Sequence, residues 1–344
     1  MNNKILSIIV PTYNMEDLLD KCLTSLILEN RVQRSMLDVI VVIDGATDRS
    51  SDIAHRYAGK YPEMFSVIDK ENGNYGSCIN AALPHVKGKY VRILDADDCY
   101  CTENLMAYLD ILKTTDTDLV LSDYVTVNEK GEEIDKTTFP LTTDVVVEFS
   151  ELRDDTPLAM HAVAYRTTIF DEIDYHQTEG VSYTDMEWIF HPLSRVKNLY
   201  YFHKPIYRYL LGREGQTVDT ITMIKRLDHR EKGLWSQLEV FISQKTDNPA
   251  YKRMENMILG RLHFIYLNSL SRYSDFDLKR FDSLLKLKYP SFYKELENYC
   301  VPVGAFNFQM PIVKIWRKFR NKKMMVFHPL FALYIINKIL RKRC

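Results

Sequence analysis

Three aspartates lie within one short segment of this chain. Asp95, Asp97 and Asp98 belong to YVRILDADDCY, directly after an apolar run. Carboxylates this close repel one another unless a cation relieves the repulsion, and Mg²⁺ or Mn²⁺ prefers oxygen ligands. A cation held by few carboxylates keeps open positions for phosphate oxygens. The spacing alone therefore leaves two interpretations open, a metal–diphosphate site and a solvated acidic turn.

Three earlier phrases also place polar or small residues directly after an apolar run. SIIVPTYNMEDLL and VIDGATDRSSDIA end in turns, where Asn14, Asp48 or Ser50 could cap the following helix. In ENGNYGSCINAAL, small residues let backbone approach a ligand closely. Taken singly, each phrase is explained as well by turn and cap chemistry as by binding. The residues that a ligand would meet are Pro11, Thr12, Tyr13, Asn14, Asp44, Asn72, Gly73, Asn74 and Gly76.

The first half of the chain predicts a sheet that would bring these phrases together. Short β-branched runs alternate with amphipathic stretches, which is typical of βα units in a mostly parallel α/β sheet with helices on both faces. Ligands of such sheets bind at the carboxyl ends of the strands. The expected strands are 5–10, 39–44, 65–69 and 90–95, and the expected helices are 15–28, 49–61 and 75–86.

The rest of the chain predicts fewer strands and then long helices. A strand at 119–127 precedes a β-hairpin or loop excursion that reaches 145–149. Helical periodicity returns at 183–194, and 197–202 is a further strand candidate. Beyond Thr220 the pattern becomes amphipathic and strongly charged, which indicates helices at 221–243, 251–273 and 275–287.

The four phrases, in this order and spacing, closely resemble family 2 glycosyltransferases of the Rossmann-like GT-A fold, over roughly residues 5–215. The resemblance makes DADD the DxD signature, with Asp97 the first choice of metal ligand and Asp95 a second ligand near the ribose. It aligns Asp44 with an aspartate that reads uracil or ribose. Two departures, Ile43 and Ala46 in place of Asp and Ser, leave base recognition to Asp44 alone.

The same resemblance extends to two later segments. In GVSYTDMEWIFHPL it aligns Asp185 with the base that deprotonates the acceptor hydroxyl, with Glu187 as the fallback; the alternative is that Asp185 only caps a helix. In PIYRYLLGREGQTVD it places Arg213 and Thr217 over the diphosphate of the donor, and Arg208 is a rival for the arginine.

The resemblance implies an inverting transfer of a sugar from a UDP-sugar, with Mn²⁺ or Mg²⁺, to a glycan or lipid-linked acceptor in bacterial capsule, exopolysaccharide or other envelope synthesis. A sugar-phosphate nucleotidyltransferase would carry a Gly-rich, basic loop after the first strand, which PTYNMEDLL is not. A non-catalytic sugar-nucleotide-binding protein would be expected to have lost the DxD or the base. We expect a GT-A domain at 1–220, a helical extension at 221–310 and a tail at 311–344.

Composition and charge bear on partners and location. The net charge of −1 argues against nucleic-acid binding, but residues 311–344 hold ten basic residues, no acidic ones and many aromatic ones. This composition suits an anionic membrane surface, and the alternative is packing on the protein. Six cysteines without a CxxC pair and a short N-terminal apolar run predict a cytoplasmic protein, and the basic tail would place it at the inner face of the plasma membrane. The spacing of His161, His176, His191 and His203 is unlike that of metal ligands and favours structural or acceptor-side roles, although His203 could complete a metal shell.

Overall fold

The computed structural model describes residues 3–213, 219–303 and 308–320. The chain divides into two compact units: residues 1–214 with 239–254 form the first, and residues 215–238 with 255–344 form the second. The domain boundaries predicted at residues 220 and 310 stay predictions, because compactness alone does not show which segments fold independently.

The first unit is built on one ten-stranded sheet, in which the strand order is β3-β2-β1-β4-β9-β6-β10-β5, with β7 beside β6 and β8 beside β10. The strands β1 to β4 are parallel, and β1 and β2 are almost wholly buried, as a sheet covered on both faces requires. The predicted α/β fold is therefore confirmed. The strands are β1 (Leu6–Thr12), β2 (Leu37–Asp44), β3 (Phe65–Lys70), β4 (Tyr90–Ile93), β5 (Cys99–Tyr100), β6 (Leu119–Val127), β7 (Glu133–Thr137), β8 (Val146–Glu148), β9 (Val163–Arg166) and β10 (Asn198–Leu210).

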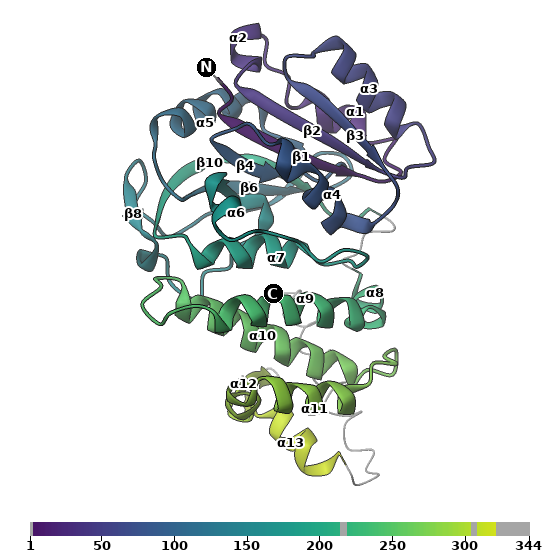
Figure 1. Cartoon of the computed structure of the whole chain (residues 1–344), viewed down its shortest axis with the longest axis vertical. Helices are drawn as coiled ribbons and strands as arrows, with labels where there is room; N and C mark the ends of the chain where they lie inside the picture. Colours follow the sequence, from purple (N-terminus) through teal and green to yellow (C-terminus); the bar gives the residue numbers. More distant parts are fainter. Residues whose placement is uncertain (1–2, 214–218, 304–307, 321–344) are drawn as a thin grey trace. The chain divides into compact units, whose positions relative to one another are not determined.

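Helices cover both faces of the parallel part of this sheet. Because crossovers between parallel strands are right-handed, α4 lies on the face opposite to α1 and α3, as Figure 1 shows. No helix was predicted at α5 (Thr102–Thr114), which follows the acidic loop and the short strand β5. The helices are α1 (Leu19–Thr24), α2 (Arg31–Arg34), α3 (Ser50–Lys60), α4 (Asn74–Ala82), α5 (Thr102–Thr114), α6 (Thr168–Glu172) and α7 (Asp185–Phe190), and short 3-10 turns occur at Leu83–His85, Phe149–Glu151, Met160–Ala162 and His191–Ser194.

The second half of the sheet is mixed. β9 is antiparallel to both β4 and β6, whereas β10 runs parallel to β6 along most of its length. The pairing of β10 shifts register on both sides of Pro205, which has no N–H to donate to a ladder. The predicted strand at 197–202 therefore continues past this irregularity to Leu210.

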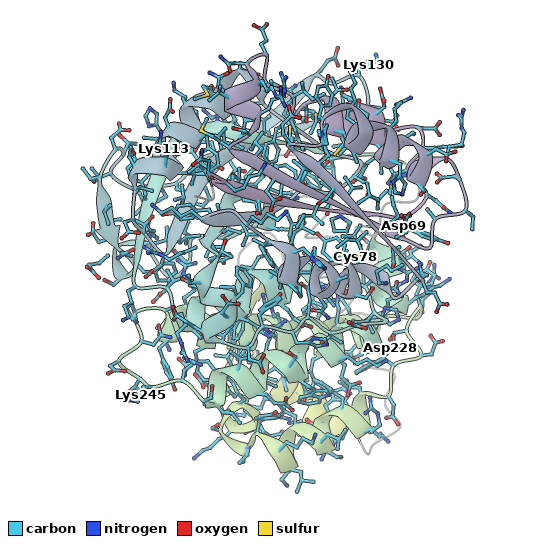
Figure 2. The ribbon with its side chains drawn as sticks, turned by 45° about the horizontal axis from the view of Figure 1, so that its top comes forward. Asp69, Cys78, Lys113, Lys130, Asp228 and Lys245 are labelled. Carbon is cyan, nitrogen blue, oxygen red and sulfur yellow. The ribbon has the colours of Figure 1, made fainter. Side chains whose placement is uncertain are left out.

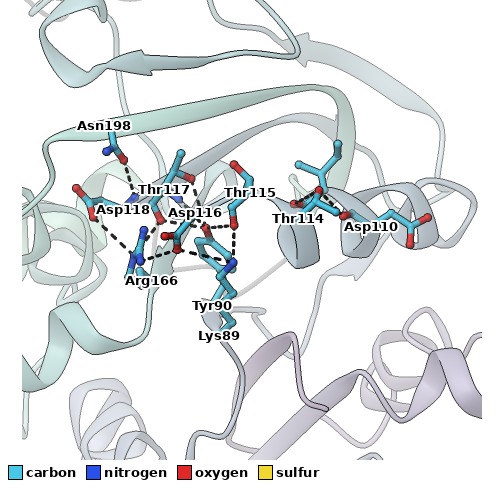
Figure 3. Close-up of polar contacts among 11 residues, drawn as sticks. Lys89, Tyr90, Asp110, Thr114, Thr115, Asp116, Thr117, Asp118, Arg166 and Asn198 are labelled. Carbon is cyan, nitrogen blue, oxygen red and sulfur yellow. Dashed lines mark hydrogen bonds and ion pairs between the residues drawn. The ribbon is translucent and has the colours of Figure 1, made fainter. Parts of the chain in front are cut away.

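The end of the sheet where β6 begins is held by a polar network, shown in Figure 3. The Arg166 guanidinium lies 2.7 Å from the Asp116 carboxylate, and its Nε donates to the Thr117 carbonyl. The Asp118 carboxylate accepts the backbone N–H of Lys197 at 2.9 Å. These contacts fasten β6, β9 and β10 together at the end of β6 remote from its carboxyl end.

The second unit is helical. The half-buried ring of Trp235 stacks on Tyr289 with centroids 5.7 Å apart and packs near the buried Phe281. The three predicted helices are found, the first of them divided into α8 and α9, whereas α12 and α13 were not predicted. Helices α9 and α10 each cross the boundary between the units. The elements that begin after residue 218 are α8 (Thr220–Lys225), α9 (Leu227–Ile242), α10 (Tyr251–Ser269), α11 (Leu278–Lys288), α12 (Pro290–Glu295), β11 (Val301–Val303), β12 (Phe308–Met310) and α13 (Ile312–Phe319).

The beginning of the basic tail packs within this second unit. Trp316 on α13 is buried, and Arg317 donates to the buried Asp282 carboxylate of α11 at 2.8 Å. Arg320 also pairs with Asp282. The alternative of packing on the protein therefore applies to these two basic residues, because folding brings them to α11. The rest of the tail, 321–344, lies outside the described residues. Within the described ranges, no helix is long and apolar enough to cross a bilayer.

Candidate active site

The strand order creates a switch point between β1 and β4. From β1 the chain adds β2 and β3 on one side, and then returns to add β4 on the other. The loops after β1 and β4 therefore leave opposite faces of the sheet, and open α/β sheets bind ligands in the crevice at this place. Pro11 and Thr12 end β1, Tyr13 and Asn14 begin the loop after it, and the loop after β4 holds the three aspartates.

The loop after β1 is tied to the loop after β2. Asn14 has a positive φ of 52°, and its side-chain oxygen accepts the backbone N–H of Thr47 at 2.8 Å. The predicted cap of α1 by Asn14 is wrong, because α1 begins after Leu18 and the Asn14 side chain is used between loops. Asp48 accepts the N–H groups of Ser50 and Glu16, which joins the same two loops. Beside Asn14, Thr12 is buried and the Tyr13 side chain is 49% exposed.

Asp44 organises the loop that leads into α4. One oxygen of its buried carboxylate lies 2.7 Å from Lys70 Nζ and accepts the N–H of Gly73 at 2.9 Å. Its backbone carbonyl accepts from the Asn72 side chain. Asp44, Asn72 and Gly73 are therefore brought together as expected, although the Lys70 partner was not predicted. A direct contact of Asp44 with a base or ribose stays a prediction.

The start of α4 is packed against a later segment. A side chain at Gly76 would place its Cβ 2.1 Å from the Thr178 carbonyl oxygen, so this glycine permits contact between two backbones. Asn74 has a positive φ of 66°, and the Gly73 carbonyl accepts the N–H of Gly180. Cys78, labelled in Figure 2, also lies on α4, and its side chain is buried.

Two of the three aspartates after β4 are held without a basic partner. Asp98 is buried, and its carboxylate accepts the Leu210 N–H at 2.6 Å and the Tyr207 hydroxyl at 2.7 Å. Asp95 accepts the Tyr75 hydroxyl at 2.8 Å. Burial first, and then the neighbouring carboxylates, raises the pKa of both Asp95 and Asp98. Neither one makes an ion pair with any residue that the structure describes.

The third aspartate has a different partner. Asp97 lies 2.9 Å from the Arg213 guanidinium, which comes from the segment after β10. Gly212, just before it, has a positive φ of 103°. The structure thus joins the residue predicted to hold the metal with the residue predicted to hold the diphosphate. Thr217 lies outside the described residues. The rival Arg208 is engaged elsewhere, 3.0 Å from Glu133 on β7.

Asp185 is the first residue of α7, and Thr184 is its N-cap. The charge of Asp185 contributes to the raised pKa of Asp95 and of Tyr75, so the expected base lies close to the acidic loop. The fallback base, Glu187, is fully buried and accepts the Thr178 N–H at 2.9 Å. This bond joins α7 to the segment that packs on Gly76.

Several aromatic residues of the site were not predicted. Tyr207 and Tyr209 alternate with Arg208 along β10, and this period of two could have placed both tyrosines on one face of the strand. Tyr209 stacks on the His161 ring, with centroids 4.2 Å apart. Burial, followed by the charges of Asp98, Asp95, Asp97 and Asp185, raises the pKa of Tyr209 to about 12.

His161 is the histidine that reaches the acidic loop. One of its ring nitrogens and one carboxylate oxygen each from Asp95 and Asp98 all lie within 4.8 Å of one another. Burial, followed by the charge of Arg92, lowers the pKa of His161 to about 3, so its imidazole is neutral. Nitrogen and oxygen donors at this separation fit a divalent cation. The prediction that Asp97 binds the metal stays untested, because its carboxylate is not among these three.

The other three histidines lie in different surroundings. His176 contacts the Asn80 side chain, His191 is buried beside Tyr175, and His203 is exposed on β10.

Comparison with known proteins assigns the family. The model of Glycosyl transferase family 2 matches residues 7–174. The chain is 34% identical over 128 residues to poly(ribitol-phosphate) beta-glucosyltransferase of Bacillus spizizenii, a match that covers 37% of this chain and 20% of that protein. It is 27% identical over 220 residues to the uncharacterized glycosyltransferase MG025 of Mycoplasma genitalium, covering 63% of this chain and 71% of that protein. Residues 7–174 therefore form a domain of glycosyltransferase family 2.

A solved structure supports the same fold. The crystal structure of S. aureus TarS 1-349 in complex with UDP-GlcNAc has a TM-score of 0.62 and 20% sequence identity to this chain, and the match covers 82% of this chain and 79% of that one. At this identity the likeness shows the fold, which is GT-A. The expected family and fold are confirmed.

Proposed function

We propose that this chain transfers a sugar, with inversion, from a UDP-sugar to a hydroxyl group of a glycan or lipid-linked acceptor in the synthesis of a cell-envelope polysaccharide. The observation that carries the proposal is the gathering of Asp95, Asp97 and Asp185 at the carboxyl end of β4, where Arg213 is also present. A donor diphosphate needs positive charge, and an acceptor hydroxyl needs a base. The TarS complex with UDP-GlcNAc supports UDP as the nucleotide.

The bond changes assign one task to each residue. Asp185 accepts the proton of the acceptor hydroxyl while its oxygen forms a bond to the anomeric carbon. The bond between that carbon and the diphosphate oxygen breaks on the opposite face, and UDP leaves with the electron pair. Arg213 exchanges Asp97 for the departing diphosphate, because a planar guanidinium can donate two parallel hydrogen bonds to phosphate oxygens. Asp97 and Asp95 would hold Mn²⁺ or Mg²⁺, which neutralises charge on the leaving group.

The donor side of the site is built before any donor binds. Asp44, Lys70 and Gly73 hold one another, and Gly76 lets α4 pack closely on Thr178. Glu187 then fastens Thr178 to α7, which carries Asp185. This chain of contacts links the donor loop to the base, so the two halves of the reaction are positioned by one framework. Such preorganisation lowers the reorganisation required in the transition state.

The proposal is tested by measuring UDP release from a panel of UDP-sugars by the purified full chain with Mn²⁺, with and without EDTA. We expect release from one donor, its loss in EDTA, and a fall of about 10²–10⁴-fold in Asp185→Asn because the base is gone. Asp171→Asn, an exposed aspartate on α6, is the matched control and should retain the rate.

Two results would contradict the proposal. If no UDP-sugar is cleaved and none binds by calorimetry, the chain does not use this donor. If Asp185→Asn turns over as fast as Asp171→Asn, the base lies elsewhere.

A further inference from the structure

The register of the sheet brings a histidine to the acidic loop. β4 and β9 are antiparallel, with Tyr90 opposite Arg166 and Val91 opposite Tyr165. His161 lies in the 3-10 turn Met160–Ala162, which leads directly into β9, so this pairing brings the turn to the carboxyl end of β4. There the His161 ring nitrogen approaches the Asp95 and Asp98 carboxylates.

The backbone and ring of His161 are both fixed. The buried Arg92 donates to the His161 carbonyl and, through its other terminal nitrogen, to Ser122 and Tyr108. The imidazole is stacked on Tyr209 and lies 4.7 Å, between ring centroids, from Tyr207. Yet its nitrogens make no hydrogen bond or ion pair with any of the residues described. A preorganised nitrogen donor therefore faces the two carboxylates without a protein partner of its own.

We propose that His161 and Asp98 join Asp95 as direct ligands of the divalent cation, and that His161 makes the site selective for Mn²⁺ over Mg²⁺. Mg²⁺ is a hard cation that strongly favours oxygen ligands and keeps its water, whereas a transition ion accepts an imidazole nitrogen. Each Asp98 oxygen accepts one hydrogen bond and keeps a lone pair for a cation. The inference rests on the proposed function for the role of the cation, but its ligands can be tested without a donor.

The test is electron spin-echo envelope modulation of Mn²⁺ bound to the full chain, produced with ¹⁴N-histidine or ¹⁵N-histidine and without any nucleotide. We expect a nitrogen coupling that changes with the histidine isotope. It should vanish in His161→Phe, which keeps an aromatic ring on Tyr209, and persist in His203→Phe, the same change at an exposed histidine on β10. The ratio of the Mg²⁺ to the Mn²⁺ dissociation constant, measured by competition, should fall about 10-fold or more in His161→Phe alone.

Each outcome decides the inference. An isotope-independent spectrum of the unaltered chain overturns it even if His161→Phe fails to fold. A coupling that survives in His161→Phe but disappears in His203→Phe would assign the ligand to His203 instead. If Mn²⁺-dependent UDP release occurs without histidine coupling, the proposed function stands and the His161 ligand is wrong. If the coupling is present but no UDP-sugar is bound or cleaved, the metal site stands and the proposed function fails.

Discussion

Two aspartate pairs of identical spacing lie at opposite ends of the strands of the same sheet. Asp95-Ala96-Asp97 follows β4, whereas Asp116-Thr117-Asp118 precedes β6, which runs in the same direction as β4. A motif search by spacing treats the two pairs alike. Their position relative to the strand distinguishes them, because functional loops of such sheets lie at the carboxyl ends.

The surroundings of the two pairs differ in charge. Asp116 and Asp118 share Arg166, and the Lys197 N–H also donates to Asp118. In the other pair, Asp97 contacts Arg213, while Asp95 is met by a tyrosine hydroxyl and by further carboxylates. Asp116 and Asp118 are therefore both neutralised by protein partners, as in a structural network. The pair Asp95 and Asp97 is left with excess negative charge, which a bound cation would relieve.

The largest difference should appear in catalysis. We expect Asp97→Asn to lower metal-dependent UDP release about 10–100-fold, since even an outer partner of a metal ligand contributes this much to metal affinity or activity. Asp116→Asn, the same change in the structural pair, should keep the rate within about twofold, because exposed ion pairs contribute little. Initial rates at saturating Mn²⁺ decide this. Equal losses in the two variants would remove the distinction between the pairs.

A smaller difference should appear in the response of stability to the cation. Mn²⁺ at 100 times its dissociation constant should raise the free energy of unfolding of the unaltered chain by about 2.7 kcal/mol, because it binds the folded state. Asp95→Asn should lose most of this gain, and Asp118→Asn should keep it. Denaturant titrations with and without Mn²⁺ measure the gain. If Asp118→Asn loses it as well, the cation is not acting at the acidic loop after β4.

Much of this sheet was predictable because its signals are local. The apolar runs that form β1 to β3 and the nine-residue run of β6 were predicted nearly to the residue. Helix α5 was missed even though Leu105, Tyr108, Leu109 and Leu112 are buried at helical spacing, a signal that the sequence does contain. The short strands β5 and β9 carry too few residues for a periodic pattern.

The site was predictable where one segment supplied it and not where distant segments meet. DADD and the Asp44 phrase are continuous in sequence, so their residues could be named in advance. Tyr75 and His161 meet Asp95 only through pairing across the sheet and through the packing of α4, which spacing does not encode. For the same reason the sequence does not reveal the acidic partner of Arg317 in the tail, because Asp282 comes from another helix.

The smallest expected difference concerns stability without a cation, and it should have opposite signs in the two pairs. A carboxyl whose pKa is raised by folding destabilises the folded state once the pH exceeds its unfolded pKa of about 4, because the unfolded chain then releases the proton more readily. In EDTA at pH 8, Asp95→Asn should therefore leave the free energy of unfolding unchanged or raise it by up to about 1 kcal/mol, since Asn still accepts the Tyr75 hydroxyl. Asp118→Asn should lower it by about 0.5–1.5 kcal/mol, because Arg166 loses a charged partner. Urea titrations at pH 5 and pH 8 measure both effects, and the benefit of Asp95→Asn should shrink at the lower pH. If Asp95→Asn is destabilised at pH 8, the charged form of Asp95 is stabilised by the protein itself, as that of Asp118 is.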